Sequence, residues 1–215
     1  MVKMNIIIKA IIVTALIFAA NLSIIFYIEN SRNTQVTDEI KQLEETQLDS
    51  QITLSLLQTG DQKTYCQIMM TELEAQTEKL YPLFNQLRDY EKASLITQYQ
   101  ETKRSFILQN LQYYSQHSQL LEKCPNVNYT TILYFYPDTT LCTDCSVQAD
   151  VLTALRQECP TVRVFAIPTD YDFSSIKTLI KEYNVTKTPT LVINGKIKVE
   201  TVKNKEELKT ILGKC

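Results

Sequence analysis

The chain has 215 residues, with 22 basic and 24 acidic side chains and a formal net charge of −2. This near balance excludes the basic surface by which proteins usually bind nucleic acid. The sequence also contains no glycine-rich phosphate-binding loop, which excludes a nucleotide site of that kind.

Residues 10–28 form an uncharged, mainly apolar segment near the N-terminus. At ~1.5 Å per residue, a helix of this length matches the hydrocarbon core of a bilayer. A cleavable signal peptide is the alternative, because Phe18-Ala19-Ala20 brings small residues to a suitable cleavage position. The apolar stretch continues beyond them to Ile28, which favours an uncleaved transmembrane helix.

The charges around this segment predict its orientation. Lys3 and Lys9 lie within residues 1–9, whereas Glu29 and Asp38 follow the apolar stretch. The Lys/Arg bias predicts that residues 1–9 are a cytoplasmic stub and that the rest of the chain is extracytoplasmic. We therefore expect a single-pass protein of the cell membrane with its N-terminus inside. Disulfides can form outside the cytoplasm among the six cysteines.

Residues 35–124 are poor in glycine and proline, which predicts helices and no strands. The first helix should end near Gly60, a second should start at Asp61, and a third should end at Lys123. Pro82 should kink or break the second helix. We expect a helical hairpin or a small three-helix bundle.

Plain core packing is the preferred interpretation of the Tyr and Leu side chains in this region, ahead of a ligand site. A dimerising coiled coil is less favoured because the heptads are irregular. His117 is predicted to be an exposed helix residue. Cys66 and Cys124 should meet in an antiparallel hairpin that turns near their midpoint, so we predict a structural disulfide between them, with free thiols as the alternative.

The most informative motif is Cys142-Thr143-Asp144-Cys145. A strand pattern covers residues 131–136 before it, and a helical pattern covers residues 146–158 after it. Cys142 should therefore lie at a helix N-terminus, which favours the thiolate that attacks disulfides. A zinc site would need two further ligands, and no second close cysteine pair is present. A structural bridge is the other alternative.

A second motif lies downstream, where Lys187-Thr188-Pro189-Thr190 leads into an apolar run at residues 191–193. Asn194-Gly195 then predicts a hairpin turn. Residues 196–202 alternate polar and apolar side chains, which predicts an edge strand. Pro189 would open the first strand of this hairpin, where its missing N–H is tolerated.

A strand at residues 161–167 and helices at residues 173–183 and 205–212 complete the order β-α-β-α-β-β-α. This order, with the CxxC motif after the first strand and Thr-Pro before the third, resembles the thioredoxin family. The resemblance implies an α/β thioredoxin-like domain at residues 128–215, preceded by the transmembrane helix and the all-α region.

The resemblance also implies roles for individual residues. Cys142 would be the exposed nucleophile and Cys145 the resolving thiol. Pro189 matches the cis-proline that faces the dithiol and supports substrate backbone pairing, and Thr188 matches the residue that lines the substrate groove. The physical cost of a cis bond before proline is only about 0.5–1 kcal/mol.

Two positions depart from the family pattern. Leu141 stands where thioredoxins carry Trp, and Tyr134 stands where many members carry a buried carboxylate that helps to deprotonate the resolving cysteine. Asp144 should oppose a second negative charge on Cys142, which predicts a reducing or intermediate couple and not a strong oxidant. The alternative is that Asp144 is solvated and caps the helix with little redox effect.

The fold that the resemblance implies also brings the ends of two helices together at Cys159 and Cys215, which predicts a second structural disulfide. The expected function is a membrane-anchored extracytoplasmic thiol–disulfide oxidoreductase that needs no cofactor or metal. Its partners would be protein thiols and disulfides and an unidentified redox partner. The alternative is an interaction or assembly adaptor whose helical region binds a partner and whose thioredoxin-like domain is redox-poised or inactive.

Overall fold

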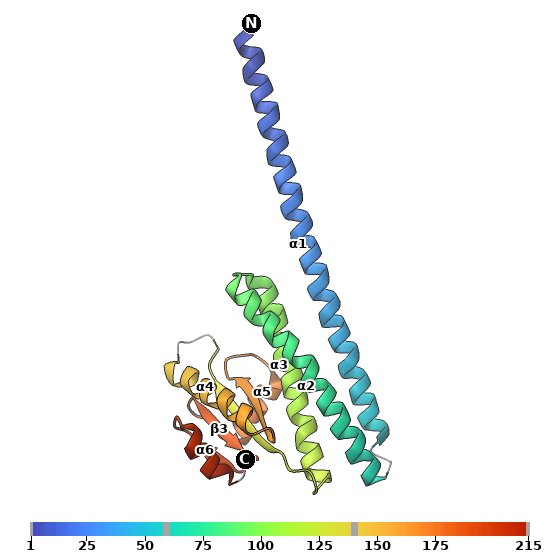
Figure 1. The fold of residues 1–215 in the computed structure, drawn as a ribbon, viewed down its shortest axis with the longest axis vertical. Coiled ribbons are helices and arrows are strands. Elements are labelled where there is room, and N and C mark those ends of the chain that lie inside the picture. Colours follow the sequence, from blue (N-terminus) through green and yellow to red (C-terminus); the bar gives the residue numbers. More distant parts are fainter. Residues whose placement is uncertain (1, 58–60, 139–141, 214–215) are drawn as a thin grey trace.

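The computed structural model describes residues 2–57, 61–138 and 142–213. One long helix, α1 (Val2–Leu57), extends far beyond the body formed by the other elements (Figure 1). The predicted span and the predicted first helix are therefore parts of one continuous helix. Gly60, the predicted end of that helix, lies outside the described residues.

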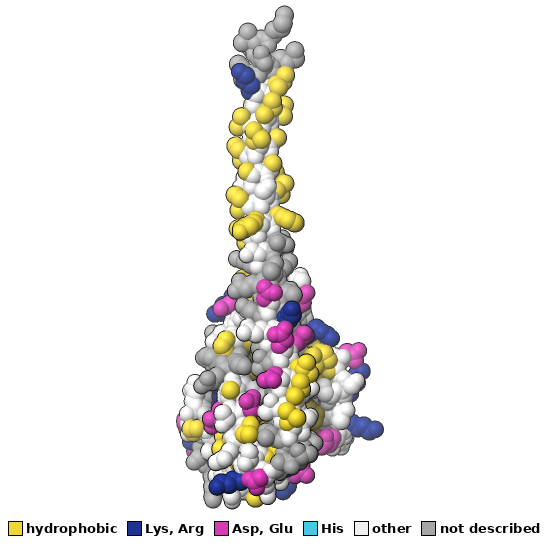
Figure 2. Space-filling model, turned by 90° about the vertical axis from the view of Figure 1, so that its right-hand side faces the viewer, with side chains coloured by type: hydrophobic (Ala, Val, Ile, Leu, Met, Phe, Trp, Pro, Cys, Tyr) yellow, Lys and Arg dark blue, Asp and Glu magenta, His cyan; other side chains and the backbone are white. Residues whose placement is uncertain are grey.

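Within the described part of the chain, Ile8–Ile28 is the one helical segment long and apolar enough to cross a membrane. None of this segment is buried against the rest of the protein. Apolar side chains surround the upper part of α1 in Figure 2, whereas most charged side chains gather on the body below. The segment thus has the length and the apolar surface that a single membrane span requires.

Two further helices, α2 (Gln62–Lys92) and α3 (Ile96–Lys123), form an antiparallel hairpin. Asp61 is the N-cap of α2, as predicted, and its carboxylate accepts a hydrogen bond of 3.1 Å from the Thr64 N–H. The helix continues through Pro82, so the predicted break does not occur. Proline removes one intrahelical hydrogen bond, and α2 nevertheless continues past it along α3.

A four-stranded mixed sheet follows the hairpin, in the order β2-β1-β3-β4. Its strands are β1 (Thr130–Tyr136), β2 (Val162–Pro168), β3 (Thr190–Ile193) and β4 (Ile197–Val199). β1 pairs in parallel with β2 and antiparallel with β3. Asn194 and Gly195 adopt φ of 50° and 65°, the left-handed conformation that the predicted turn needs. β4 lies at the sheet edge, as predicted, but is shorter than the predicted strand.

Helices cover both faces of the sheet. These helices are α4 (Thr143–Glu158), α5 (Ser174–Glu182) and α6 (Lys205–Leu212). Leu133 and Phe135 of β1 pack in one apolar cluster with the α2–α3 hairpin and α5, and Tyr134 packs in a second cluster with α4 and α6. Successive strand side chains point to opposite faces, so the two clusters lie on the two sides of the sheet. The helical hairpin therefore shares a hydrophobic core with the sheet.

His117 lies in this shared core, so the prediction of an exposed position is wrong. Its side chain is 1% exposed, and its ring centroid lies 4.5 Å from that of Tyr113 and 5.6 Å from that of Phe165. Among the described residues, neither ring nitrogen has a hydrogen-bond partner. The sheet covers the side of α3 that carries His117, an arrangement that local sequence pattern does not reveal.

Candidate redox site

Cys142 and Cys145 form a disulfide at the start of α4, with their Cα atoms 5.2 Å apart. Cys142 is the N-cap residue, and its sulfur accepts a hydrogen bond of 3.2 Å from the Cys145 N–H. Cys145 is buried, whereas Cys142 is half-buried. After reduction, the N–H groups of the first turn would stabilise a thiolate at Cys142, the more accessible of the two sulfurs.

The peptide bond between Thr188 and Pro189 is cis, and Pro189 is buried. The register pairs Thr190 of β3 with Phe135, one residue before the end of β1. Pro189 therefore lies at the end of the sheet where β1 leads toward Cys142. The structure brings the dithiol and the Thr-Pro motif, predicted separately, to the same end of the sheet.

Tyr134, which stands where many thioredoxins carry a buried carboxylate, contacts the helix that carries the dithiol. Its hydroxyl donates a hydrogen bond of 2.6 Å to the Cys145 carbonyl oxygen. Its ring stacks on that of Tyr136, with centroids 5.3 Å apart. Burial raises the pKa of Tyr134 to about 12, so the phenol stays protonated at neutral pH. Tyr134 therefore positions the first turn of α4 and does not supply a base.

A buried ion pair lies just before the dithiol, and the sequence did not predict it. The Lys103 ammonium of α3 lies 2.5 Å from Asp138 Oδ1, and the two side chains are 13% and 14% exposed. Burial lowers the pKa of Lys103, but Tyr136 and Asp138 outweigh that effect and hold it above the usual lysine range. No sequence signal links these residues, because they lie 35 positions apart and belong to no shared motif.

The other cysteines that the structure describes, Cys66, Cys124 and Cys159, lie away from this end of the sheet. Cys66 and Cys124, the pair that the hairpin predicts, are joined by a disulfide with a Cα separation of 5.9 Å. Cys159 is fully buried at the C-terminal end of α4 and is not a free thiol. Its predicted partner, Cys215, lies outside the described residues, so that pairing stays a prediction.

A family model described as a thioredoxin domain matches residues 138–213, which include both the CxxC and the Thr-Pro motifs. None of the curated proteins matches the chain. Among solved structures, the chain is similar to thioredoxin O2 from Arabidopsis thaliana in its oxidized state, at 20% identity and a TM-score of 0.35. That alignment covers 46% of this chain and 85% of the Arabidopsis chain.

Proposed function

Since residues 130–213 form a thioredoxin-like domain, we propose that the protein is a thiol–disulfide oxidoreductase with Cys142 as nucleophile and Cys145 as resolving thiol. One observation carries this proposal: the disulfide at the N-terminus of α4 joins a more accessible sulfur to a buried one. A nucleophile must reach its substrate, whereas a resolving thiol needs only to reach the nucleophile.

The reaction in the reducing direction has two exchange steps. The Cys142 thiolate attacks one sulfur of a substrate disulfide, and the other substrate sulfur leaves as a thiolate and takes up a proton. Cys145 then loses its proton to solvent and attacks the Cys142 sulfur, which releases the second substrate sulfur. Two electrons and two protons pass to the substrate, and the Cys142–Cys145 disulfide forms. Oxidation of a substrate dithiol is the reverse sequence.

We propose that the substrate is a protein segment that lies extended beside Thr188 and Pro189. The cis peptide directly precedes β3, at the end of the sheet from which the chain leads toward Cys142. An extended substrate backbone at this position could pair with the main chain of the protein, as an added strand does. Protein thiols and disulfides, and a separate protein that restores the redox state, would be the partners.

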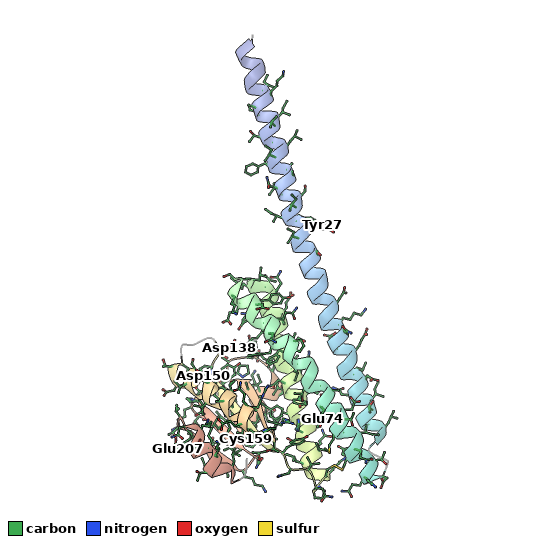
Figure 3. The ribbon with its side chains drawn as sticks, in the orientation of Figure 1. Tyr27, Glu74, Asp138, Asp150, Cys159 and Glu207 are labelled. Atoms are coloured by element: carbon green, nitrogen blue, oxygen red, sulfur yellow. A yellow bond between two sulfur atoms is a disulfide. The ribbon has the colours of Figure 1, made fainter. Side chains whose placement is uncertain are left out.

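We propose further that Ile8–Ile28 is an uncleaved anchor and that the body lies outside the cytoplasm. The continuity of α1 supports this, because one helix runs from the apolar segment to the hairpin. In Figure 3, Tyr27 marks the end of the apolar segment, and Asp138 lies on the side of the body toward it, whereas Cys159 lies on the far side. Cysteines near the membrane surface would therefore be favoured substrates.

The full chain carrying Cys145→Ser tests the enzymatic function, because its mixed disulfides cannot be resolved. We expect protein adducts that a reductant releases and that disappear in the matched variant with both Cys142→Ser and Cys145→Ser. If Cys145→Ser forms no adducts in the membrane fraction, the adaptor function replaces the enzymatic one. Retention of an N-terminal tag on the membrane-bound protein after alkaline extraction would support the anchor, whereas loss of the tag would indicate a cleaved signal peptide.

A further inference from the structure

The helical hairpin contacts Asp138, four residues before Cys142, through Lys103. This lysine lies on α3, and Asp138 lies between β1 and Cys142. The Lys103 ammonium also donates a hydrogen bond of 2.9 Å to the Tyr99 hydroxyl. Because both charged groups of the pair are largely buried, each depends on the other for compensation of its charge.

Asp138 is held from a second direction by the segment after β2. Its backbone N–H donates to both carboxylate oxygens of Asp170, at 2.9 and 3.0 Å. Its side chain is meanwhile bound by Lys103. Asp138 is therefore fixed between α3 and the β2–α5 connection, four residues before Cys142.

A second line of contact to the dithiol starts at Tyr136, two residues before Asp138. The Tyr136 ring stacks on that of Tyr134, whose hydroxyl donates a hydrogen bond to the Cys145 carbonyl oxygen. Burial raises the pKa of Tyr136 well above the usual tyrosine range, so this phenol is neutral at physiological pH. The charges of this cluster are therefore those of Lys103, Asp138 and Asp170.

We propose that Lys103 is a positioning residue of the dithiol, which acts by compensating the charge of Asp138 and fixing this residue four positions before Cys142. This inference rests on the proposed function and gives the hairpin a role in the chemistry of that site. Loss of Lys103 would leave the Asp138 carboxylate uncompensated, and a nearby negative charge disfavours a thiolate. Loss of the Asp138 charge would leave Lys103 uncompensated, and a nearby positive charge favours a thiolate.

Removing Lys103 and removing the Asp138 charge should therefore change the stability of the Cys142 thiolate in opposite directions. This opposition separates an electrostatic role from a merely structural one. The test measures alkylation of Cys142 by iodoacetamide against pH, in the reduced full chain with Cys145→Ser as background. Lys103→Met should slow alkylation at neutral pH by about three- to tenfold, and Asp138→Asn should accelerate it by a similar factor. The double variant should return to within about twofold of the background rate, and Lys103→Arg should preserve it.

Lys177→Met is the matched control, because it removes an exposed ion pair between Lys177 of α5 and Asp172 and should leave the rate unchanged. Equal slowing by Lys103→Met and Asp138→Asn, or an unchanged rate in both, would overturn the inference. If Lys103→Met does not fold, the acceleration expected for Asp138→Asn still decides. Alkylation needs no substrate turnover, so this result is independent of whether Cys145→Ser traps mixed disulfides.

Discussion

The hydroxyl of Tyr134 donates a hydrogen bond of 2.6 Å to the carbonyl oxygen of Cys145, across the boundary between the central strand and the helix that carries the dithiol. Tyr134 is 4% exposed, so water does not compete for this bond. The bond fixes the first turn of α4 against β1. Tyr134, which stands where many thioredoxins carry a buried carboxylate, thus contributes order to the site and no proton acceptor.

The first prediction concerns this bond. Tyr134→Phe should keep the fold and lower the free energy of unfolding of the oxidised protein by about 1 kcal/mol, since one buried hydrogen bond is lost. Tyr65→Phe is the matched control, because the Tyr65 side chain is buried and its hydroxyl has no hydrogen-bond partner within the described residues. Tyr65→Phe should leave the free energy of unfolding unchanged or raise it slightly. Urea unfolding measures both, and equal losses in the two variants would contradict the assignment.

The second prediction concerns the acidic residue between the cysteines. Asp144 is exposed in the first turn of α4, so Asp144→Asn should stabilise the Cys142 thiolate and make the couple more oxidising by roughly 10–20 mV. Equilibration with glutathione buffers measures the reduction potential. Asp150→Asn, also exposed and farther along the same helix, should leave it unchanged. A potential that stays constant or falls in Asp144→Asn would refute this prediction, and a constant potential is the result that a solvated cap predicts.

The third prediction concerns the hairpin disulfide. Cys66 and Cys124 are separated by 58 positions, so replacing both with Ser should lower the free energy of unfolding by about 4 kcal/mol on the loop-closure relation. Replacing Cys142 and Cys145 should cost only about 2 kcal/mol, because that loop is much shorter. Denaturant unfolding of the two double variants gives the comparison. A smaller loss for the long loop than for the short one would contradict it.

Elements with local chemical signals could be predicted from the sequence. The CxxC motif predicted a helix starting at Cys142, Asn194-Gly195 predicted a tight turn, and α6 has the predicted bounds. Each of these features depends on residues close together in the chain: a thiol cap, two left-handed backbone conformations, and a run of helical spacing.

The packing of the hairpin on the sheet could not be predicted, because polar side chains form much of the buried face of α3. Gln98, Gln109, Asn110 and His117 are buried there, so apolar periodicity does not mark the face that meets the sheet. Asn110 shows how such a side chain is accommodated, since its amide donates a hydrogen bond of 2.8 Å to the Ala166 carbonyl of β2. The Lys103–Asp138 pair depends on this packing and was missed for the same reason.

The fourth prediction concerns the pH dependence of stability. Burial, with a smaller effect of the Arg163 charge, lowers the pKa of His117 from 6.5 to about 4 in the folded protein. Between these values the unfolded chain binds a proton that the folded protein does not, so the free energy of unfolding should fall by up to about 3 kcal/mol as the pH drops from 6.5 to 4. His117 is the single histidine. The pKa of Glu158 is lowered from 4.5 to about 2 by its hydrogen bonds with Lys205 and Lys209, so the stabilisation from Glu158 is lost only as the pH falls below 4.5. Urea unfolding at pH 7.5, 5.5 and 4.5 should show the loss in the wild type and little of it in His117→Phe. A slope that persists in His117→Phe would assign the acid sensitivity to another group.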